Sequence, residues 1–308
     1  MNRYDPPLDL TIRCGLYLTY VAQAPTPIVL LIKPRIDRGQ HIEREQFTVE
    51  PHSSLEEHED EHGNMVHRLM LSPGETRIRH DAFVSAPSVP ENVGTFGHIP
   101  AIGELPLHLL RYVLPSRYCD SDRLRNFAAQ RFGHYPHGLP VVQAICEWVH
   151  RNIQYRFGSG SPLTAASEII SQGYGVCRDF AHTAIALCRT FNIPARYVTG
   201  YVPDVGCYDP GTPMDFHAYF EVYVGGHWQT FDARFNTPRT GRIKIACGLD
   251  AVDGAFSTLY GPAQLTMFQV WAYQIDPQQV NLGDPIDLSK RFCGTPQLRF
   301  PLRRQQML

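Results

Sequence analysis

The chain has 308 residues, of which 43% are hydrophobic and 19% charged, so it holds enough apolar material for one large core or two ordinary ones. Its net charge of −2 argues against a protein that binds nucleic acid or an acidic membrane surface. Residues Met1–Leu10 lack the apolar run of a signal peptide, and the longest wholly apolar run, Pro27–Ile32, is too short to cross a bilayer. Eight irregularly spaced cysteines do not form a disulfide framework, so we expect a cytoplasmic protein.

Alternating apolar and polar residues predict an antiparallel β-sandwich for residues 1–90. The pattern is clearest over Leu10–Leu18, where every second residue is apolar. Turn sequences such as His62-Gly63-Asn64 separate the further candidate strands. These candidates are Pro27–Ile32, Phe47–Val49, Met65–Leu71 and Thr76–Val84.

The same region contains His58-Glu59-Asp60-Glu61-His62, which matches the H-E-x-x-H pattern of zinc proteases letter for letter. That motif works on a helix with an apolar face against the core. This segment has no apolar position and runs into a Gly-Asn turn. We therefore expect neither a metal site nor a cofactor.

A stretch rich in proline and glycine, Pro87–Pro106, predicts a linker, after which the apolar period becomes helical. Helices are predicted at Leu139–Ile153 and Ala165–Ser171, and a third begins at Cys177. The chain then returns to strands. They are predicted at Ala195–Val202, Phe216–Val224, His227–Arg234 and Gln264–Gln274.

Cys177 follows two glycines and begins an apolar stripe with helical spacing, which Asn192-Ile193-Pro194 ends. In the first turn of a helix, unpaired backbone N–H groups and the positive end of the dipole favour a thiolate. Cys177 is therefore either a nucleophile of low pKa or a small hydrophobic residue packed at the helix start. His182 lies on another side of this helix and should pack behind the site.

A Gly-Gly pair, Gly225-Gly226, lies between two strand-like runs and predicts a two-residue hairpin. If Val224 pairs with His227, Asp232 is the diagonal neighbour of His217 on the same face. Such neighbours have Cα atoms about 7–8 Å apart, within reach of an imidazole and a carboxylate. A thiol nucleophile needs such a base and a group that orients it. The alternative is a solvent-facing His217 and an Asp232 that only ends a strand.

Four segments resemble the motifs of the bacterial transglutaminase-like cysteine proteases of the papain-like superfamily. The motifs are G-x-G-x-C opening a helix, a G-I-P-A-R-Y-V-x-G-Y strand, an H-A-W-x-E-V strand, and W-x-x-x-D ending its hairpin partner. Here they correspond to Gly173–Cys177, Asn192–Tyr201, His217–Val222 and Trp228–Asp232. The departures are Asn192 for Gly, Tyr219 for Trp, and Asp232-Ala233-Arg234 for Asp-Pro. They leave the shape of the substrate pocket, and so the substrate, undetermined.

The resemblance implies an α+β protein with an N-terminal antiparallel β-sandwich and a papain-like transglutaminase core. Its parts would be the sandwich (1–90), a linker (91–120), the catalytic domain (121–276) and a C-terminal extension (277–308). It also implies a triad of Cys177, His217 and Asp232. The backbone N–H of Cys177 should help to bind the oxyanion, and Gln172 and Tyr174 are candidates for a further oxyanion or pocket contact.

The predicted reaction is acyl transfer on a peptide or protein substrate through a thioester on Cys177, with water as acceptor, as in a peptidase or amidase. Transamidation to an amine uses the same thioester and stays open, because access for the acceptor depends on loops such as Val205–Met214. A non-catalytic binding or scaffolding protein that retains the fold is the alternative of another class.

Overall fold

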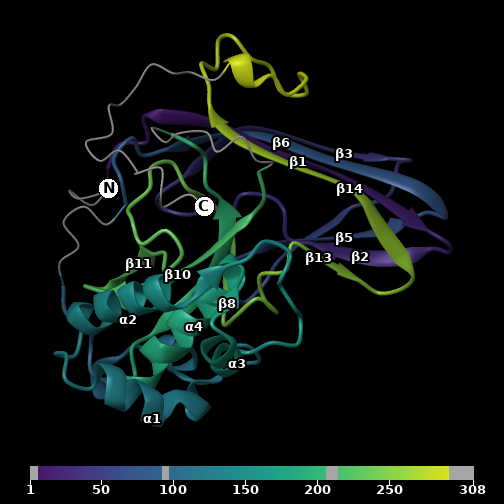
Figure 1. The fold of residues 1–308 in the computed structure, drawn as a ribbon. Coiled ribbons are helices and arrows are strands. Elements are labelled where there is room, and N and C mark those ends of the chain that lie inside the picture. Colours follow the sequence, from purple (N-terminus) through teal and green to yellow (C-terminus); the bar gives the residue numbers. More distant parts are fainter. Residues whose placement is uncertain (1–5, 92–96, 206–213, 291–308) are drawn as a thin grey trace.

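The computed structural model describes residues 6–91, 97–205 and 214–290. These residues form an α+β fold, as predicted, with three four-stranded antiparallel sheets and a layer of helices (Figure 1). The sheets have the strand orders β14-β1-β6-β3, β13-β2-β5-β4 and β11-β10-β9-β12. No helix in the described ranges is long and apolar enough to cross a membrane.

The first two sheets enclose a common core, visible as the two stacked layers at the right of Figure 1. Alternate residues of β1, such as Leu16 and Leu18, point into it and meet Ile28 and Leu69 from the facing sheet. This alternation is the pattern that predicted the strands. The strands are β1 (Leu10–Ala22), β2 (Thr26–Leu30), β3 (His41–Glu50), β4 (Glu56–Glu59), β5 (Met65–Leu71), β6 (Gly74–Ala86), β13 (Ser257–Leu259) and β14 (Ala263–Gln274).

Two of these strands come from the far end of the chain. The strand predicted at Gln264–Gln274 was grouped with residues 121–276, yet β14 pairs along nearly the whole of β1, from Ile12↔Gln274 to Val21↔Gln264. β13 likewise pairs with β2. The pairing satisfies the backbone groups that an edge strand would leave open, and an alternating pattern does not reveal which sheet a strand joins.

The third sheet carries the helices, with α4 packed on β9 and β10 and surrounded by α1, α2 and α3. The helices predicted at Leu139–Ile153 and Ala165–Ser171 are present within a residue of those bounds. The elements of this part are η1 (Ile102–Glu104), η2 (Leu107–Val113), α1 (Ser121–Phe132), α2 (Leu139–Asn152), β7 (Gln154–Tyr155), α3 (Ala166–Gln172), β8 (Tyr174–Gly175), α4 (Cys177–Thr190), β9 (Ala195–Tyr201), β10 (His217–Val224), β11 (His227–Phe231) and β12 (Ile243–Gly248).

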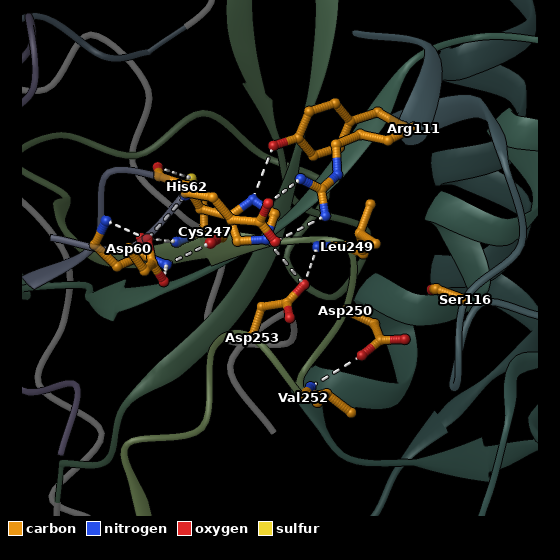
Figure 2. A network of polar contacts seen from close by, with 12 residues as sticks. Asp60, His62, Arg111, Ser116, Cys247, Leu249, Asp250, Val252 and Asp253 are labelled. Atoms are coloured by element: carbon orange, nitrogen blue, oxygen red, sulfur yellow. Dashed lines mark hydrogen bonds and ion pairs between the residues drawn. The ribbon is translucent and has the colours of Figure 1, made fainter. Parts of the chain in front are cut away.

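The face of this sheet that α4 leaves free is covered by polar groups of the N-terminal part. In the turn after β4, Asp60 accepts the backbone N–H groups of His62 (2.9 Å) and Asn64 (2.8 Å). The Asn64 amide bonds both backbone groups of Cys247 in β12, at 2.8 Å each. Figure 2 shows this turn against Cys247, with His62 facing Asp253 at 3.4 Å. The turn thus fixes the sandwich to the sheet.

The end of the chain returns over the sandwich. η3 (Leu288–Lys290) is the last described element. Before it, the backbone carbonyl of Asp284 accepts hydrogen bonds from Arg13 (2.6 Å) and Arg79 (2.9 Å). Of the expected C-terminal extension, residues 291–308 lie outside the described residues, as do 206–213 of the loop expected to control acceptor access.

The ion pair of Arg13 with Asp81 tests the packing of the sandwich, since both side chains are only 1% exposed. The guanidinium bonds the carboxylate twice, at 3.0 and 2.7 Å. Asp81→Leu should lower the free energy of unfolding by about 3–5 kcal/mol, because it leaves a buried charge without its counter-ion. The double variant Arg13→Met with Asp81→Leu should recover most of that loss in urea unfolding. Equal stability of the single and double variants would contradict this account.

Candidate active site

The start of α4 explains the spacing of the glycines before Cys177. Gly173 ends α3 with a φ of +74°, which favours glycine. The Asp179 carboxylate reaches back to accept the backbone N–H of Val176 at 2.9 Å, as in a capping box. A Cβ atom on Gly175 would lie 2.7 Å from that of Asp179, so the cap requires glycine there. Cys177 is consequently the first residue of the helix.

The Cys177 thiol lies half-buried beside β10, where the backbone of Ala218 hydrogen-bonds the sulfur. Burial raises the pKa of this thiol above its usual value, although the hydrogen bond from Ala218 and the charge of Arg234 act in the opposite direction. The expected low pKa is therefore not what the structure supports. Desolvation outweighs the helix start here, and the resting group is a thiol.

A hydrogen bond of 2.8 Å joins Nε2 of His217, the residue directly before Ala218, to Oδ2 of Asp232. The hairpin has the predicted register, with Val224 opposite His227, and it brings the two buried side chains together as expected. Since Asp232 is ionised, the proton of this hydrogen bond belongs to Nε2. The other ring nitrogen, Nδ1, is then free to accept a proton.

The imidazole of His217 is uncharged near neutral pH. Burial lowers the pKa of His217 to about 4, even though Asp232 acts to raise it. The charges of Arg242 and Arg234 lower it further. A neutral imidazole can act as a general base. Among the described residues no hydrogen bond joins the His217 ring to the Cys177 sulfur, so the meeting of these two groups stays a prediction.

Asp232 is held by four donors. Its Oδ1 accepts the backbone N–H groups of Arg234 (3.0 Å) and Phe235 (3.2 Å). Its Oδ2 accepts His217 and, at 2.7 Å, Nη2 of Arg242. Burial alone would raise the pKa of Asp232, but His217 and Arg242 hold it well below its usual range. The carboxylate therefore stays charged in a buried position.

Arg242 is a contact that the sequence motifs did not indicate. It precedes β12 and bonds Glu91 through Nε, with 2.8 Å to each carboxylate oxygen. Its sequence signal is weak: Arg242 is one of two basic residues, with Lys244, that alternate with isoleucines at the start of a strand run. Glu91 gives less, because it stands in the stretch expected to be a linker.

Gln172 and Tyr174, the other predicted site residues, lie just before α4. Gln172 is exposed, and its amide donates to the backbone carbonyl of Tyr174 at 2.7 Å. The guanidinium of Arg156 stacks on the Tyr174 ring at 4.1 Å. Both side chains are engaged with their neighbours in this state, and a role in binding an oxyanion stays a prediction.

Two charged residues stand near the sulfur. Arg234 lies over the ring of Tyr155 at 3.6 Å, and Asp215 is exposed two residues before His217. Both act electrostatically on Cys177. Arg234 belongs to the Asp-Ala-Arg sequence that departs from the family motif, so this departure supplies a cation whose charge acts on Cys177.

His182 packs behind the site, as predicted. Its ring stacks on Tyr118 with centroids 5.1 Å apart, and Nε2 accepts the backbone N–H of Ala251 at 3.1 Å. In the segment that matches the zinc pattern, Glu56–Glu59 is a strand, His58 is exposed, and His62 is buried with Nδ1 3.0 Å from the Tyr112 hydroxyl. The two histidines do not share a helix face.

The low pKa of His217 should be measurable in the stability of the protein. In the unfolded chain His217 titrates near pH 6.5, but in the native state only at about 4. Between these values the unfolded state binds more protons, so lowering the pH destabilises the fold by up to about 1.4 kcal/mol per pH unit. His217→Gln should remove this contribution and flatten the dependence in urea unfolding. An unchanged slope would show that His217 charges equally in both states.

Comparisons with known proteins agree with this architecture. Residues 125–233 match the Transglutaminase-like superfamily. The fold superposes with a TM-score of 0.78 on the crystal structure of "a Putative Cysteine Protease from Cytophaga hutchinsonii", at 34% sequence identity over 87% of this chain and 91% of that one.

Two curated relatives match a shorter part of the chain. An uncharacterized protein of Mycobacterium leprae is 29% identical over 118 residues, 37% of this chain and 42% of that protein. An uncharacterized protein of Mycobacterium tuberculosis is 33% identical over 82 residues, 27% of this chain and 26% of that protein. The matches thus span less than half of these curated relatives. The Cytophaga match, at 34% identity over 91% of that chain, together with the superfamily match, shows that the chain belongs to the transglutaminase-like cysteine protease family.

Proposed function

We propose that the protein transfers acyl groups from peptide or amide substrates through a thioester on Cys177, with water as the main acceptor. The observation that carries this proposal is the buried pair of His217 and Asp232. Because Asp232 engages Nε2 of His217, Nδ1 of this neutral imidazole is free to accept a proton. The next residue, Ala218, bonds the Cys177 sulfur through its backbone. This arrangement supplies a nucleophile, a base and an orienting carboxylate.

In the first step, Nδ1 of His217 would take the proton of the Cys177 thiol while the sulfur attacks the substrate carbonyl carbon. Asp232 stabilises the imidazolium that forms. The imidazolium then protonates the departing amine, and the C–N bond breaks to leave the thioester. In the second step, His217 takes a proton from water, the resulting oxygen nucleophile attacks the thioester, and the acid product leaves as the thiol is restored.

The oxyanion of each tetrahedral intermediate needs donors that are in place before the reaction. The backbone N–H of Cys177 lies in the first turn of α4, where no intrahelical acceptor exists. The dipole of a 14-residue helix adds to its effect. Because the resting thiol is protonated, proton transfer and attack would occur together rather than from a preformed ion pair.

Transamidation is the second candidate, with a primary amine in place of water. The observation that favours it is Asp215, an exposed carboxylate whose charge acts on Cys177. Such a group would attract a cationic amine to the thioester.

All six described cysteines are free, which supports a reducing compartment such as the cytoplasm for either reaction.

Cys177→Ala should abolish turnover of a peptide and glutamine-amide library, assayed with and without a primary amine. Cys188→Ala is the matched control. Cys188 lies on the same helix, is fully buried in the apolar core, and should tolerate the loss of its sulfur. Iodoacetamide should also label Cys177 ahead of the buried Cys14, Cys119, Cys146, Cys188 and Cys247. Full turnover by Cys177→Ala would refute the thioester, and labelling without any turnover would favour a scaffolding protein.

Asp232→Asn should retain the fold and lower kcat by about 10³- to 10⁴-fold, since the imidazole loses the partner that selects its tautomer. Steady-state kinetics on the best substrate of the library measure the effect. A change confined to KM would place Asp232 in substrate binding instead. The ratio of amine adduct to free acid, recorded by mass spectrometry, separates transamidation from hydrolysis.

A further inference from the structure

We propose that Glu91 and Arg242 form a charge bridge that positions Asp232, so that the segment following the N-terminal sandwich sets the proton balance of Cys177 and His217. The consequence for catalysis rests on the proposed function, but the geometry does not. Neither residue touches the reacting atoms, and both act through Asp232 as positioning residues.

The bridge is a single guanidinium between two carboxylates. Arg242 contacts Asp232 Oδ2 through Nη2 at 2.7 Å and Glu91 through Nε at 2.8 Å to each oxygen. The side chains of Arg242 and Asp232 are 5% and 3% exposed, and that of Glu91 is 17% exposed. At such depth the charges interact far more strongly than at the surface.

Each member of the bridge is fixed from several sides. The backbone N–H of Glu91 donates to the carbonyl of Arg239 at 3.0 Å, and Arg239 returns its own N–H to the Glu91 carboxylate at 3.2 Å. The guanidinium of Arg242 lies 4.5 Å from the centre of the Tyr219 ring, and that ring stacks beside His217. Arg242 therefore has one orientation, set by an anchor on either side.

The bridge decides how Asp232 faces the imidazole. His217 and Arg242 both donate to Oδ2, at 2.8 and 2.7 Å. Two donors on one oxygen divide its negative charge, so the Arg242 guanidinium limits how strongly Asp232 can stabilise the imidazolium. Glu91 in turn neutralises part of the charge of Arg242. The bridge is thus a balance of charges behind the base.

The signs of the effects follow from the net charge. With Glu91 and Asp232 ionised, the bridge and Asp232 together carry one negative charge, and replacing Arg242 by Gln makes it two, whereas replacing Glu91 by Gln makes it zero. Other charged or titratable groups near His217 or Cys177 are Arg234, Asp215, Tyr155, Tyr197 and Tyr219. These stay unchanged in every variant.

The bridge also gives the expected linker a role at the site. Glu91 follows the end of β6 by five residues and lies in the proline-rich stretch Pro87–Pro106. Through Glu91, the segment after the sandwich contacts Arg242, which in turn contacts the Asp232 carboxylate. The sandwich and the candidate active site are therefore parts of one electrostatic unit.

The test is the pH dependence of Cys177 alkylation by iodoacetamide in the full chain, followed by mass spectrometry of the Cys177 peptide. Arg242→Gln should move the alkylation midpoint to higher pH by about one unit, because added negative charge disfavours the thiolate. Glu91→Gln should move it to lower pH. The double variant restores the wild-type net charge and should return the midpoint close to that of the wild type.

Arg13→Gln is the control, since it removes a buried arginine of the sandwich and should reduce stability without moving the midpoint. If the bridge were merely structural, its variants would have lower melting temperatures but the same alkylation midpoint as the wild type. This result would overturn the proposal. Should Arg242→Gln fail to fold, Glu91→Gln and Arg242→Lys are measured in its place. An alkylation midpoint of Glu91→Gln equal to that of the wild type contradicts the bridge. Alkylation needs no turnover, so a failure of the proposed acyl transfer is seen separately. In that case the wild type is inactive, while the alkylation midpoints of the variants still differ from that of the wild type.

Discussion

An ionised carboxylate buried at the end of a hairpin is the constraint on which the candidate site depends. Removing Asp232 from water is costly unless every lone pair finds a donor. The chain provides two backbone N–H groups from the next turn, one imidazole from β10 and one guanidinium from the start of β12. The position of the imidazole is a result of satisfying this one anion.

The two faces of β10 show how the fold provides these donors. Ala218, Phe220 and Val222 face the apolar core under α4, while His217 and Glu221 face the polar layer contributed by the N-terminal part. In that layer Glu221 is paired with Arg196 and Lys244. One strand thus separates an apolar core from a layer of buried charges, and the alternation of its residues places each side chain in the right medium. Cys177, in the first turn of α4, lies on the apolar side of this strand, and the approach of its sulfur to the His217 ring stays a prediction.

Local features of this arrangement could be predicted from the sequence, and long-range ones could not. The helix beginning at Cys177 and the Gly225-Gly226 hairpin follow from periodicity and turn chemistry, and the hairpin register predicted the contact of His217 with Asp232. The pairing of β14 with β1 depends on strands some 250 residues apart, and no pattern within either strand encodes it. Arg242 and Glu91 come together for the same reason, and neither carries a motif.

The pKa of Cys177 failed as a prediction for a different reason. The helix start acts locally and could be inferred from Gly173, Gly175 and the stripe that follows. Desolvation depends on what covers the sulfur, which includes β10 from forty residues later in the chain. The catalytic roles of Cys177, His217 and Asp232 remain predictions, now with a protonation state attached: a neutral thiol and a neutral imidazole at rest.

The return of β13 and β14 to the sandwich has a consequence for biosynthesis. The whole helical part is inserted between β6 and β13, so the sheets of the sandwich lack two strands until the ribosome has made residues beyond 270. Until then β1 and β2 present open edges, which invite pairing with other chains. The nascent N-terminal part therefore stays incomplete while α4 and its sheet are synthesised, and premature termination before β13 leaves each sheet of the sandwich one strand short.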